Sequence, residues 1–207
     1  SEVGVKVGKE AFTSLGPDLV RSLKADGFAV FLDLKFLDIP NTVAGACRSA
    51  VGLGVDLLNV HASGGPAMLK AAAQAVHDAA GNRPRPALIA VTVLTSMDQE
   101  TLHCIGVDSK LEEQVIRLAR LTAKAGLDGV VCSPWEAGRM RDIFNTNEAV
   151  IVTPGVRPVG SKPDDQHRIM TPEKAIAAGS TSLVIGRPIT RADNPRRAVR
   201  DILATIQ

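Results

Sequence analysis

Aromatic residues are scarce in this chain, and tyrosine is missing altogether. Of 207 residues only 3% are aromatic, with five phenylalanines, one tryptophan and no tyrosine. Proteins that bind single-stranded nucleic acid stack bases on aromatic side chains, so this composition argues against that class. The formal net charge of +2 shows no basic excess of the kind that nucleic-acid-binding domains carry.

Long apolar runs and paired cysteines are lacking too. No run of 18 or more apolar residues is present, so we predict no membrane-spanning helix, and we recognise no secretory signal. The three cysteines, Cys47, Cys104 and Cys132, lie far apart without metal-type spacing. Because each has apolar neighbours, we expect reduced thiols in the core of a cytoplasmic protein. The four histidines show no HExxH-type spacing, so we predict no metal site.

The chain does have a regular alternation of short apolar runs and longer amphipathic segments. Runs without polar alternation are typical of parallel strands that are covered on both faces. Seven such runs predict strands at 3–8, 29–34, 57–62, 87–94, 129–133, 149–155 and 182–186. Helix signals lie between them, including a capping box at 133–136 and helix-ending glycines at 27, 54, 126 and 179. We therefore predict a single α/β domain over 1–207.

Two arrangements of such a sheet are possible, an open doubly wound sheet and a closed (β/α)8 TIM barrel. No GxGxxG follows the first predicted strand, which removes one signature of the Rossmann fold. In a barrel, the carboxyl ends of the strands converge on one site. Polar residues do fall near those ends: Lys6, Asp33, Lys35, His61, Thr95, Ser133 and Arg187. We therefore predict the barrel, with these seven strands as its strands 2 to 8 and the first βα unit absent from the given sequence.

Three charges gather where the second predicted strand ends. Residues two apart on a strand point to the same side, so Asp33 and Lys35 are expected side by side, with Lys6 of the preceding strand in the same setting. Such a row is either a buried salt bridge between strands or a catalytic charge array, and spacing alone leaves both open. Asp38 precedes a helix expected to begin near Asn41, where helix capping is the ordinary role of an acidic residue.

Two glycine–arginine pairs follow the last two predicted strands: Gly155 with Arg157, and Gly186 with Arg187. Loops at these places of a barrel often bind phosphate through backbone N–H groups and bidentate arginine. A surface arginine beside glycine is the ordinary alternative. The long polar loop over 154–172 is expected to act as a lid, with Gln166 as a hydrogen-bond donor.

Several segments together resemble the bacterial type of the orotidine 5′-phosphate decarboxylase family, from Val5 to the C-terminus: VKVGKEAFTSLGP, DLKFLDIPNT, NVHASGG, IAVTVLTSM, VTPGVRP with DQHRIMTP, and VIGRPIT. DxKxxD alone is shared with a wider barrel superfamily, whereas IPNT, TPGVR and IGRP are more specific. The resemblance implies a cytoplasmic homodimer without metal or organic cofactor. It also implies a carboxy-lyase that converts orotidine 5′-monophosphate to UMP and carbon dioxide, the last step of de novo pyrimidine biosynthesis.

The resemblance implies roles for individual residues as well. Lys35 is the lysine that protonates C6 of the pyrimidine, Asp33 lies near the leaving carboxylate, and Lys6 contacts the ribose. Asp38, Ile39 and Thr42 reach into the partner subunit's site. The remaining implied substrate contacts are Thr95, Arg157, Gln166, Gly186 and Arg187. The family's ribose-binding aspartate on the first strand has no counterpart in this sequence.

Two alternatives stay open. A Mg²⁺-dependent sugar-phosphate decarboxylase or aldolase of the same superfamily shares the DxKxxD pattern. A non-catalytic barrel of the same kind would bind UMP and release no carbon dioxide, although the complete Lys–Asp–Lys row argues against it. Neither nucleic acid nor a membrane is expected as a partner.

Overall fold

The computed structural model describes residues 3–158 and 170–206. All seven predicted strands are present: β1 Val5–Gly8, β2 Val30–Phe36, β3 Leu57–His61, β4 Ala87–Val91, β5 Gly129–Val131, β6 Val150–Thr153 and β7 Ser182–Leu183. The helices are α1 Lys9–Ala25, α2 Pro40–Gly52, α3 Gly65–Ala80, α4 Gln99–Cys104, α5 Leu111–Lys124, α6 Ala137–Phe144, α7 Pro172–Ala177, α8 Arg187–Thr190 and α9 Pro195–Leu203.

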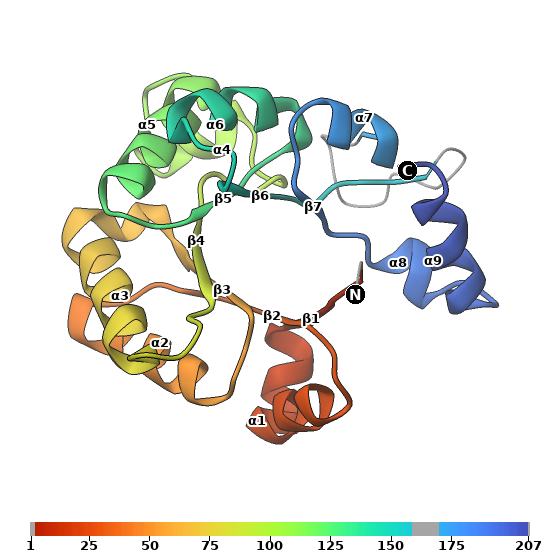
Figure 1. The fold of residues 1–207 in the computed structure, drawn as a ribbon. Helices are drawn as coiled ribbons and strands as arrows, with labels where there is room; N and C mark the ends of the chain where they lie inside the picture. Colours follow the sequence, from red (N-terminus) through yellow and green to blue (C-terminus); the bar gives the residue numbers. More distant parts are fainter. Residues whose placement is uncertain (1–2, 159–169, 207) are drawn as a thin grey trace. The chain divides into compact units, whose positions relative to one another are not determined.

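Strands that follow each other in the sequence are also neighbours in the sheet, in the order β1-β2-β3-β4-β5-β6-β7. Helical segments separate consecutive strands wherever the connection is described (Figure 1). This is the order of a (β/α)8 barrel, in which each parallel strand returns through a helix to pair with the one before it. The chain divides into two compact units, Ser1–Val91 with Leu118–Gly129, and Thr92–Arg117 with Val130–Gln207.

The first unit contains β1 to β4, which pair in parallel and in register from Val5↔Val30 through to His61↔Val91, apart from one irregularity in β2. Helices α1, α2 and α3 lie along one side of these strands (Figure 1). The core between the two layers is apolar, and its fully buried side chains include Leu32, Leu58, Met68, Leu69 and Leu88. Continuous apolar strands thus form a sheet that is covered by amphipathic helices, as the sequence pattern predicts.

A side chain just before a strand ties that strand to the amino end of its neighbour at three places. Asp56, before β3, accepts from Val30 N–H at 2.7 Å, and Asp128, before β5, accepts from Leu88 N–H at 2.7 Å. Thr181, before β7, does the same for the N–H of Ile151 at 2.8 Å. Because a buried backbone N–H needs an acceptor, these contacts complete hydrogen bonding where the strand ladder begins.

In the second unit, β6 and β7 pair in parallel with Thr153 opposite Leu183. The carboxylate of Glu136 accepts from Ser133 N–H at 2.9 Å, as the predicted capping box requires of its glutamate. Asn194 caps α9 by accepting from Arg197 N–H at 3.0 Å. The predicted helix-ending glycines are confirmed in both units, because residues 27, 54, 126 and 179 all have positive φ, which glycine adopts at little steric cost.

One prediction of local structure is wrong, and one open alternative is removed. Cys47 and Cys132 are buried as expected, but Cys104 is exposed, because it ends the short helix α4, of which only Leu102 is buried. The helix after β2 begins at Pro40 with Ile39 as its N-cap residue and without a side-chain cap, so Asp38 does not cap it.

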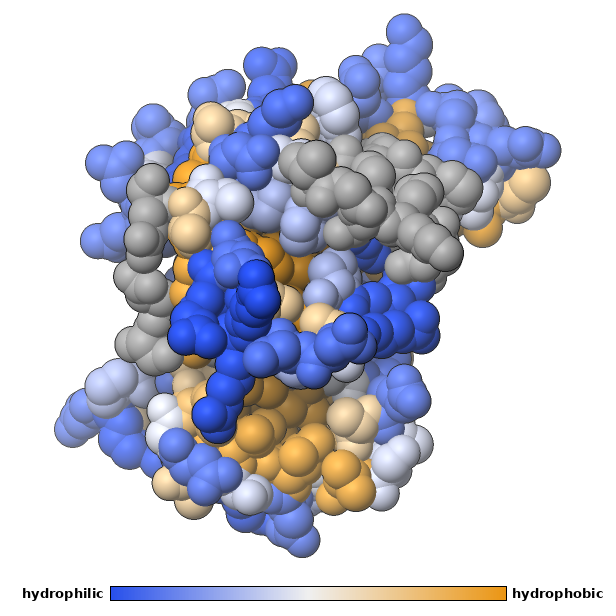
Figure 2. Space-filling view, turned by 90° about the vertical axis from the view of Figure 1, so that its right-hand side faces the viewer, coloured by the Kyte–Doolittle hydropathy of each residue, from blue (hydrophilic) through white to orange (hydrophobic). Residues whose placement is uncertain are grey.

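Figure 2 shows apolar residues gathered at the height at which α1 stands in Figure 1. In the first unit, Leu15 of α1 and Phe28, shortly before β2, are 62% and 43% exposed. Within the described part of the chain, no helix has the length and apolar character that crossing a membrane requires.

Candidate active site

Three charged side chains meet at the carboxyl ends of β1 and β2 in the first unit. Nζ of Lys35 lies 2.6 Å from Oδ1 of Asp33, and Nζ of Lys6 lies 3.0 Å from Oδ2 of the same carboxylate. The Asp33 side chain is 11% exposed, whereas those of Lys6 and Lys35 are 36% and 24% exposed. We call these three residues the Lys–Asp–Lys cluster. The side chain that carries the carboxylate is thus nearly buried, and the two lysine side chains are partly exposed.

The backbone of β2 leaves regular strand geometry at this cluster. Leu32 pairs with Leu58 but Phe36 pairs with Val60, so four residues of β2 advance against two of β3. Lys35 has φ 53°, in the left-handed region that non-glycine residues seldom adopt. Asp33 and Lys35 do lie side by side as predicted, but through a bulge rather than through strand alternation. Strained conformations of this kind concentrate at functional sites.

Asn59 of β3 joins the cluster, and we did not predict it. The residue is fully buried. Its Oδ1 accepts from Lys35 N–H at 2.8 Å, and its Nδ2 donates to Oδ1 of Asp33 at 2.7 Å. The one signal in the sequence is that Asn59 is a polar residue inside the apolar run LLNV.

Gly8 leaves the room in which the Lys6 side chain turns toward the carboxylate. Gly8 pairs with Asp33 in the β1–β2 register. A Cβ atom at Gly8 would lie 3.1 Å from Nζ of Lys6, closer than most Cβ contacts. A side chain at position 8 would therefore crowd the ammonium group that reaches Asp33.

The surroundings of Asp33 favour its ionised form. Burial raises the pKa of Asp33, but the hydrogen bond from Lys35, the charge of Lys6 and the hydrogen bond from Asn59 outweigh it and lower the pKa below the ordinary value. The carboxylate is thus a fixed negative charge at neutral pH.

His61 ends β3 near the same cluster. Burial lowers its pKa, and the positive charges of Lys9 and Lys35 lower it further, while Asp33 opposes the shift. A neutral imidazole at neutral pH follows from this direction.

The loop after β2 is exposed around Asp38. Oδ1 of Asp38 accepts from Ile39 N–H at 2.6 Å. On either side of it, Leu37 and Ile39 are 54% and 66% exposed, and Thr42 in the first turn of α2 is exposed too. The carboxylate therefore stands on a surface with apolar neighbours, outside the Lys–Asp–Lys cluster.

The remaining predicted site residues belong to the second unit. Thr95 lies half-buried in the turn after β4, and Arg157 is buried, with Nη1 donating to Val156 O at 3.1 Å. Gly186 is exposed at the N-cap of α8, and Arg187 is the first residue of that helix. Gln166 and most of the predicted lid lie outside the described residues.

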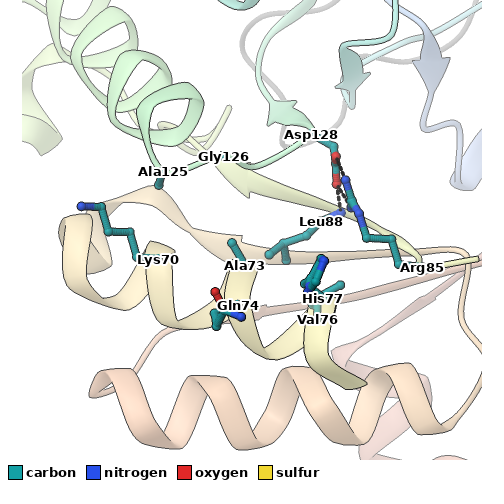
Figure 3. Close-up of a pocket in the computed structure, with 10 residues that line it drawn as sticks. All are labelled: Lys70, Ala73, Gln74, Val76, His77, Arg85, Leu88, Ala125, Gly126 and Asp128. Atoms are coloured by element: carbon teal, nitrogen blue, oxygen red, sulfur yellow. Dashed lines mark hydrogen bonds and ion pairs between the residues drawn. The ribbon is translucent and has the colours of Figure 1, made fainter. Parts of the chain in front are cut away.

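A cavity of about 400 Å³ opens elsewhere in the first unit, between α3 and the start of β4 (Figure 3). Arg85 and Asp128 face each other across two N–H···O contacts of 2.6 Å, while Lys70 and His77 project from α3. Arg85 and Asp128 precede β4 and β5, so this cavity lies at the amino ends of the strands. Residues at that end of a (β/α)8 barrel serve stability rather than chemistry.

Among residues 3–158 and 170–206, no three side chains of the His, Cys, Asp or Glu types lie together as a metal site. The Lys–Asp–Lys cluster offers chemistry of its own. Two ammonium groups around one fixed carboxylate can stabilise developing negative charge and supply a proton.

Solved structures of similar sequence share this fold. A crystal structure titled orotidine 5′-phosphate decarboxylase from Lactobacillus acidophilus matches with a TM-score of 0.86 at 36% identity, covering 98% of this chain and 86% of that chain. An uncharacterized conserved protein from Geobacillus kaustophilus matches with a TM-score of 0.86 at 41% identity, covering 99% and 88%. The predicted (β/α)8 barrel class is thereby confirmed.

Relatives in sequence carry the same name as the structure from Lactobacillus acidophilus. The chain is 58% identical over 205 residues to orotidine 5′-phosphate decarboxylase of Moorella thermoacetica, covering 98% of this chain and 81% of the relative. It is 54% identical over 202 residues to the protein of that name in Nitrosococcus oceani, covering 98% and 85%. The family model described as orotidine 5′-phosphate decarboxylase / HUMPS family matches residues 2–202. The chain belongs to this family.

Proposed function

We propose that this chain is an orotidine 5′-phosphate decarboxylase, a cytoplasmic carboxy-lyase that converts orotidine 5′-monophosphate to UMP and carbon dioxide without metal or organic cofactor. The observation that carries the proposal is the Lys–Asp–Lys cluster, with Nζ of Lys35 at 2.6 Å and Nζ of Lys6 at 3.0 Å from the Asp33 carboxylate, in a chain of this family. The reaction is the last step of de novo UMP synthesis.

The chemistry of the reaction explains why such a cluster is useful. When the bond between C6 and the carboxylate breaks, carbon dioxide leaves and the electron pair stays on C6, where no conjugated carbonyl takes up the charge. The Lys35 ammonium stabilises this charge and then gives its proton to C6, which yields UMP. Lys35 regains a proton from solvent. Because the positive charge is in place before the bond breaks, no reorganisation is needed when the negative charge develops.

Asp33 and Lys6 hold the acid in position. The Asp33 carboxylate contacts both ammonium groups, so it fixes the Lys35 side chain at one end while Lys6 remains able to contact the ribose. Its lowered pKa keeps this contact ionic at neutral pH. A carboxylate here would also lie close to that of the substrate, which raises the energy of the bound ground state.

The second unit supplies the phosphate site in this proposal. Arg187, at the first position of α8 just after the exposed Gly186, binds the phosphate. Thr95, Arg157 and Gln166 complete the substrate contacts. Binding energy from the phosphate, which is remote from C6, then contributes to closure and rate rather than to affinity alone.

The active form in this proposal is a homodimer with shared sites. Asp38 stands exposed between Leu37 and Ile39, which are 54% and 66% exposed, and Thr42 follows on α2. Apolar side chains around an accessible carboxylate suit a loop that packs into a second copy, with Asp38, Ile39 and Thr42 reaching the partner's substrate. In a two-fold dimer, each subunit lends this loop to the other.

The test is a decarboxylation assay on the full chain with orotidine 5′-monophosphate, following the fall in ultraviolet absorbance and the release of labelled carbon dioxide. We expect turnover that survives treatment with EDTA. Activity that EDTA abolishes, together with turnover of a phosphorylated keto sugar, would instead identify a Mg²⁺-dependent relative. Binding of UMP without release of carbon dioxide would identify a non-catalytic barrel.

A further inference from the structure

Asn59 is a buried amide that bonds to two groups of the neighbouring strand at once. It lies in the middle of β3 between Leu58 and Val60, and all three side chains are fully buried. A buried amide destabilises a fold unless its polar atoms find partners. Here Oδ1 accepts from Lys35 N–H at 2.8 Å and Nδ2 donates to Oδ1 of Asp33 at 2.7 Å. Both partners belong to the Lys–Asp–Lys cluster.

The contact with Lys35 gives its N–H an acceptor where the bulge interrupts the pairing of β2 with β3. Between Leu32 and Phe36 the register of β2 against β3 shifts. Lys35 takes φ 53° within this segment, a conformation that is unfavourable for a residue with a side chain. Such a conformation persists only where its surroundings hold it, and the Asn59 carbonyl accepts a hydrogen bond from the N–H of that residue.

The contact with Asp33 fixes the carboxylate from the buried side. Oδ1 of Asp33 accepts hydrogen bonds from Nδ2 of Asn59 at 2.7 Å and from Nζ of Lys35 at 2.6 Å, while Oδ2 forms the ion pair with Lys6. One oxygen is therefore shared between a neutral buried donor and the ammonium group. Without the amide, the carboxylate would keep its contacts with two ammonium groups that stand on long, flexible side chains, and the Lys35 ammonium would be held less firmly in place.

We infer that Asn59 is a positioning residue, which sets the backbone of Lys35 and the carboxylate of Asp33 together and so aims the Lys35 ammonium at the reacting carbon. The inference rests on the proposed function. If Asn59 had a structural role only, kcat would fall in proportion to the folded fraction of the variant. A positioning role predicts a larger fall in kcat, because a displacement of about 1 Å at a catalytic group lowers the rate by about 10²-fold.

The first experiment uses Asn59→Leu, which removes both hydrogen bonds at similar volume, and Asn59→Ala, which removes them without adding bulk or charge. We expect kcat to fall about 10²-fold in Asn59→Leu while KM and the Kd for UMP stay within about threefold of wild type. Asn59→Ala is the variant to use if Asn59→Leu does not fold, and kcat should fall in it too.

Thr122→Val is the matched control. Thr122 is also fully buried, and its Oγ1 donates to Leu118 O at 2.8 Å on α5, away from the cluster. This variant loses a buried hydrogen bond, so it should lose stability and keep kcat. Equal kcat losses in Thr122→Val and the Asn59 variants, or an unchanged kcat in a folded Asn59 variant, would overturn the inference.

Hydrogen exchange at the Lys35 amide tests the same inference without any turnover. In Asn59→Leu this amide loses its acceptor, so we expect it to exchange at least about tenfold faster, while the amides of β3 keep their protection. Unchanged exchange would show that Asn59 does not hold Lys35. A wild-type chain that fails to decarboxylate orotidylate would refute the proposed function, and this exchange measurement would still decide the role of Asn59.

Discussion

The ammonium of Lys35 lies 2.6 Å from the carboxylate of Asp33, two positions earlier in the chain, although the backbone between them is not regular strand. A regular strand would place both side chains on one face at a separation set by the backbone alone. The bulge, with Lys35 at φ 53°, lets the lysine approach the carboxylate while Asn59 holds the N–H. The short contact is thus a product of three residues, Lys35, Asp33 and Asn59.

Replacing Lys35 by alanine should abolish turnover and preserve binding of UMP. The Lys35 proton and charge act mainly as C6 becomes carbanionic, so we expect kcat to fall by at least about 10³-fold with the Kd for UMP little changed. Steady-state kinetics and calorimetry measure the two quantities. Lys70→Ala, at an exposed lysine on α3 beside the other cavity, is the matched control and should keep full activity. A Lys35→Ala variant with a tenth of the wild-type kcat would remove Lys35 from the acid role.

The ion pairs of Asp33 should make a pH-dependent contribution to stability. Its folded pKa is lowered, so that contribution is complete above the unfolded value of about 4 and is lost as the pH falls through the folded pKa. As the pH drops below about 4, the unfolding free energy of wild type should therefore decrease relative to that of Asp33→Asn. Urea titrations between pH 3 and pH 7 at constant ionic strength measure this difference. A difference that does not change with pH would contradict the prediction.

Arg187 should matter for substrates that carry a phosphate. Arg187→Ala loses a bidentate arginine–phosphate contact. The fall in kcat/KM for orotidylate should correspond to about 2–4 kcal/mol of lost transition-state stabilisation, and the fall for the nucleoside that lacks the phosphate should be far smaller. Arg191→Ala is the control, at an exposed arginine just after the same helix α8. Equal losses for the nucleotide and the nucleoside would place Arg187 outside the phosphate site.

The three cysteines should separate into one reactive thiol and two protected ones. Burial raises the pKa of Cys47 to about 12, and Cys132 is buried, whereas Cys104 is exposed. A thiol reagent such as DTNB at pH 8 should therefore modify Cys104 in the native protein and the other two only after unfolding. Cys104→Ser should abolish the native reaction. Rapid modification of Cys47 in native protein would contradict the burial that the structure gives it.

Strand positions were predictable because a strand that is buried on both faces is a short apolar run without polar alternation. All seven such runs form strands. The neighbourhood of Asp33 and Lys35 was predictable from their spacing, but the bulge was not, since no glycine marks it. Asn59 escaped prediction because its role depends on the register between β2 and β3, which spacing along one strand does not reveal. The role of Asp38 was open for a related reason: an acidic residue before a helix has the same pattern whether or not it caps, and here Ile39 is the N-cap residue.

A shared active site should reveal itself when two inactive variants are mixed. Asp38 is exposed in its own subunit and stands outside the Lys–Asp–Lys cluster, so its proposed target is the partner's substrate. Lys35→Ala and Asp38→Ala subunits are each expected to be inactive or nearly so. In a mixed dimer one site contains both changes and the other contains neither. Because random exchange makes about half of the dimers mixed, activity should return to about a quarter of the wild-type level per site, if the sites act independently. Exchange is verified by the mass of the mixed dimer. If mixed dimers form and no activity returns, Asp38 serves its own subunit, and the loop after β2 is not shared.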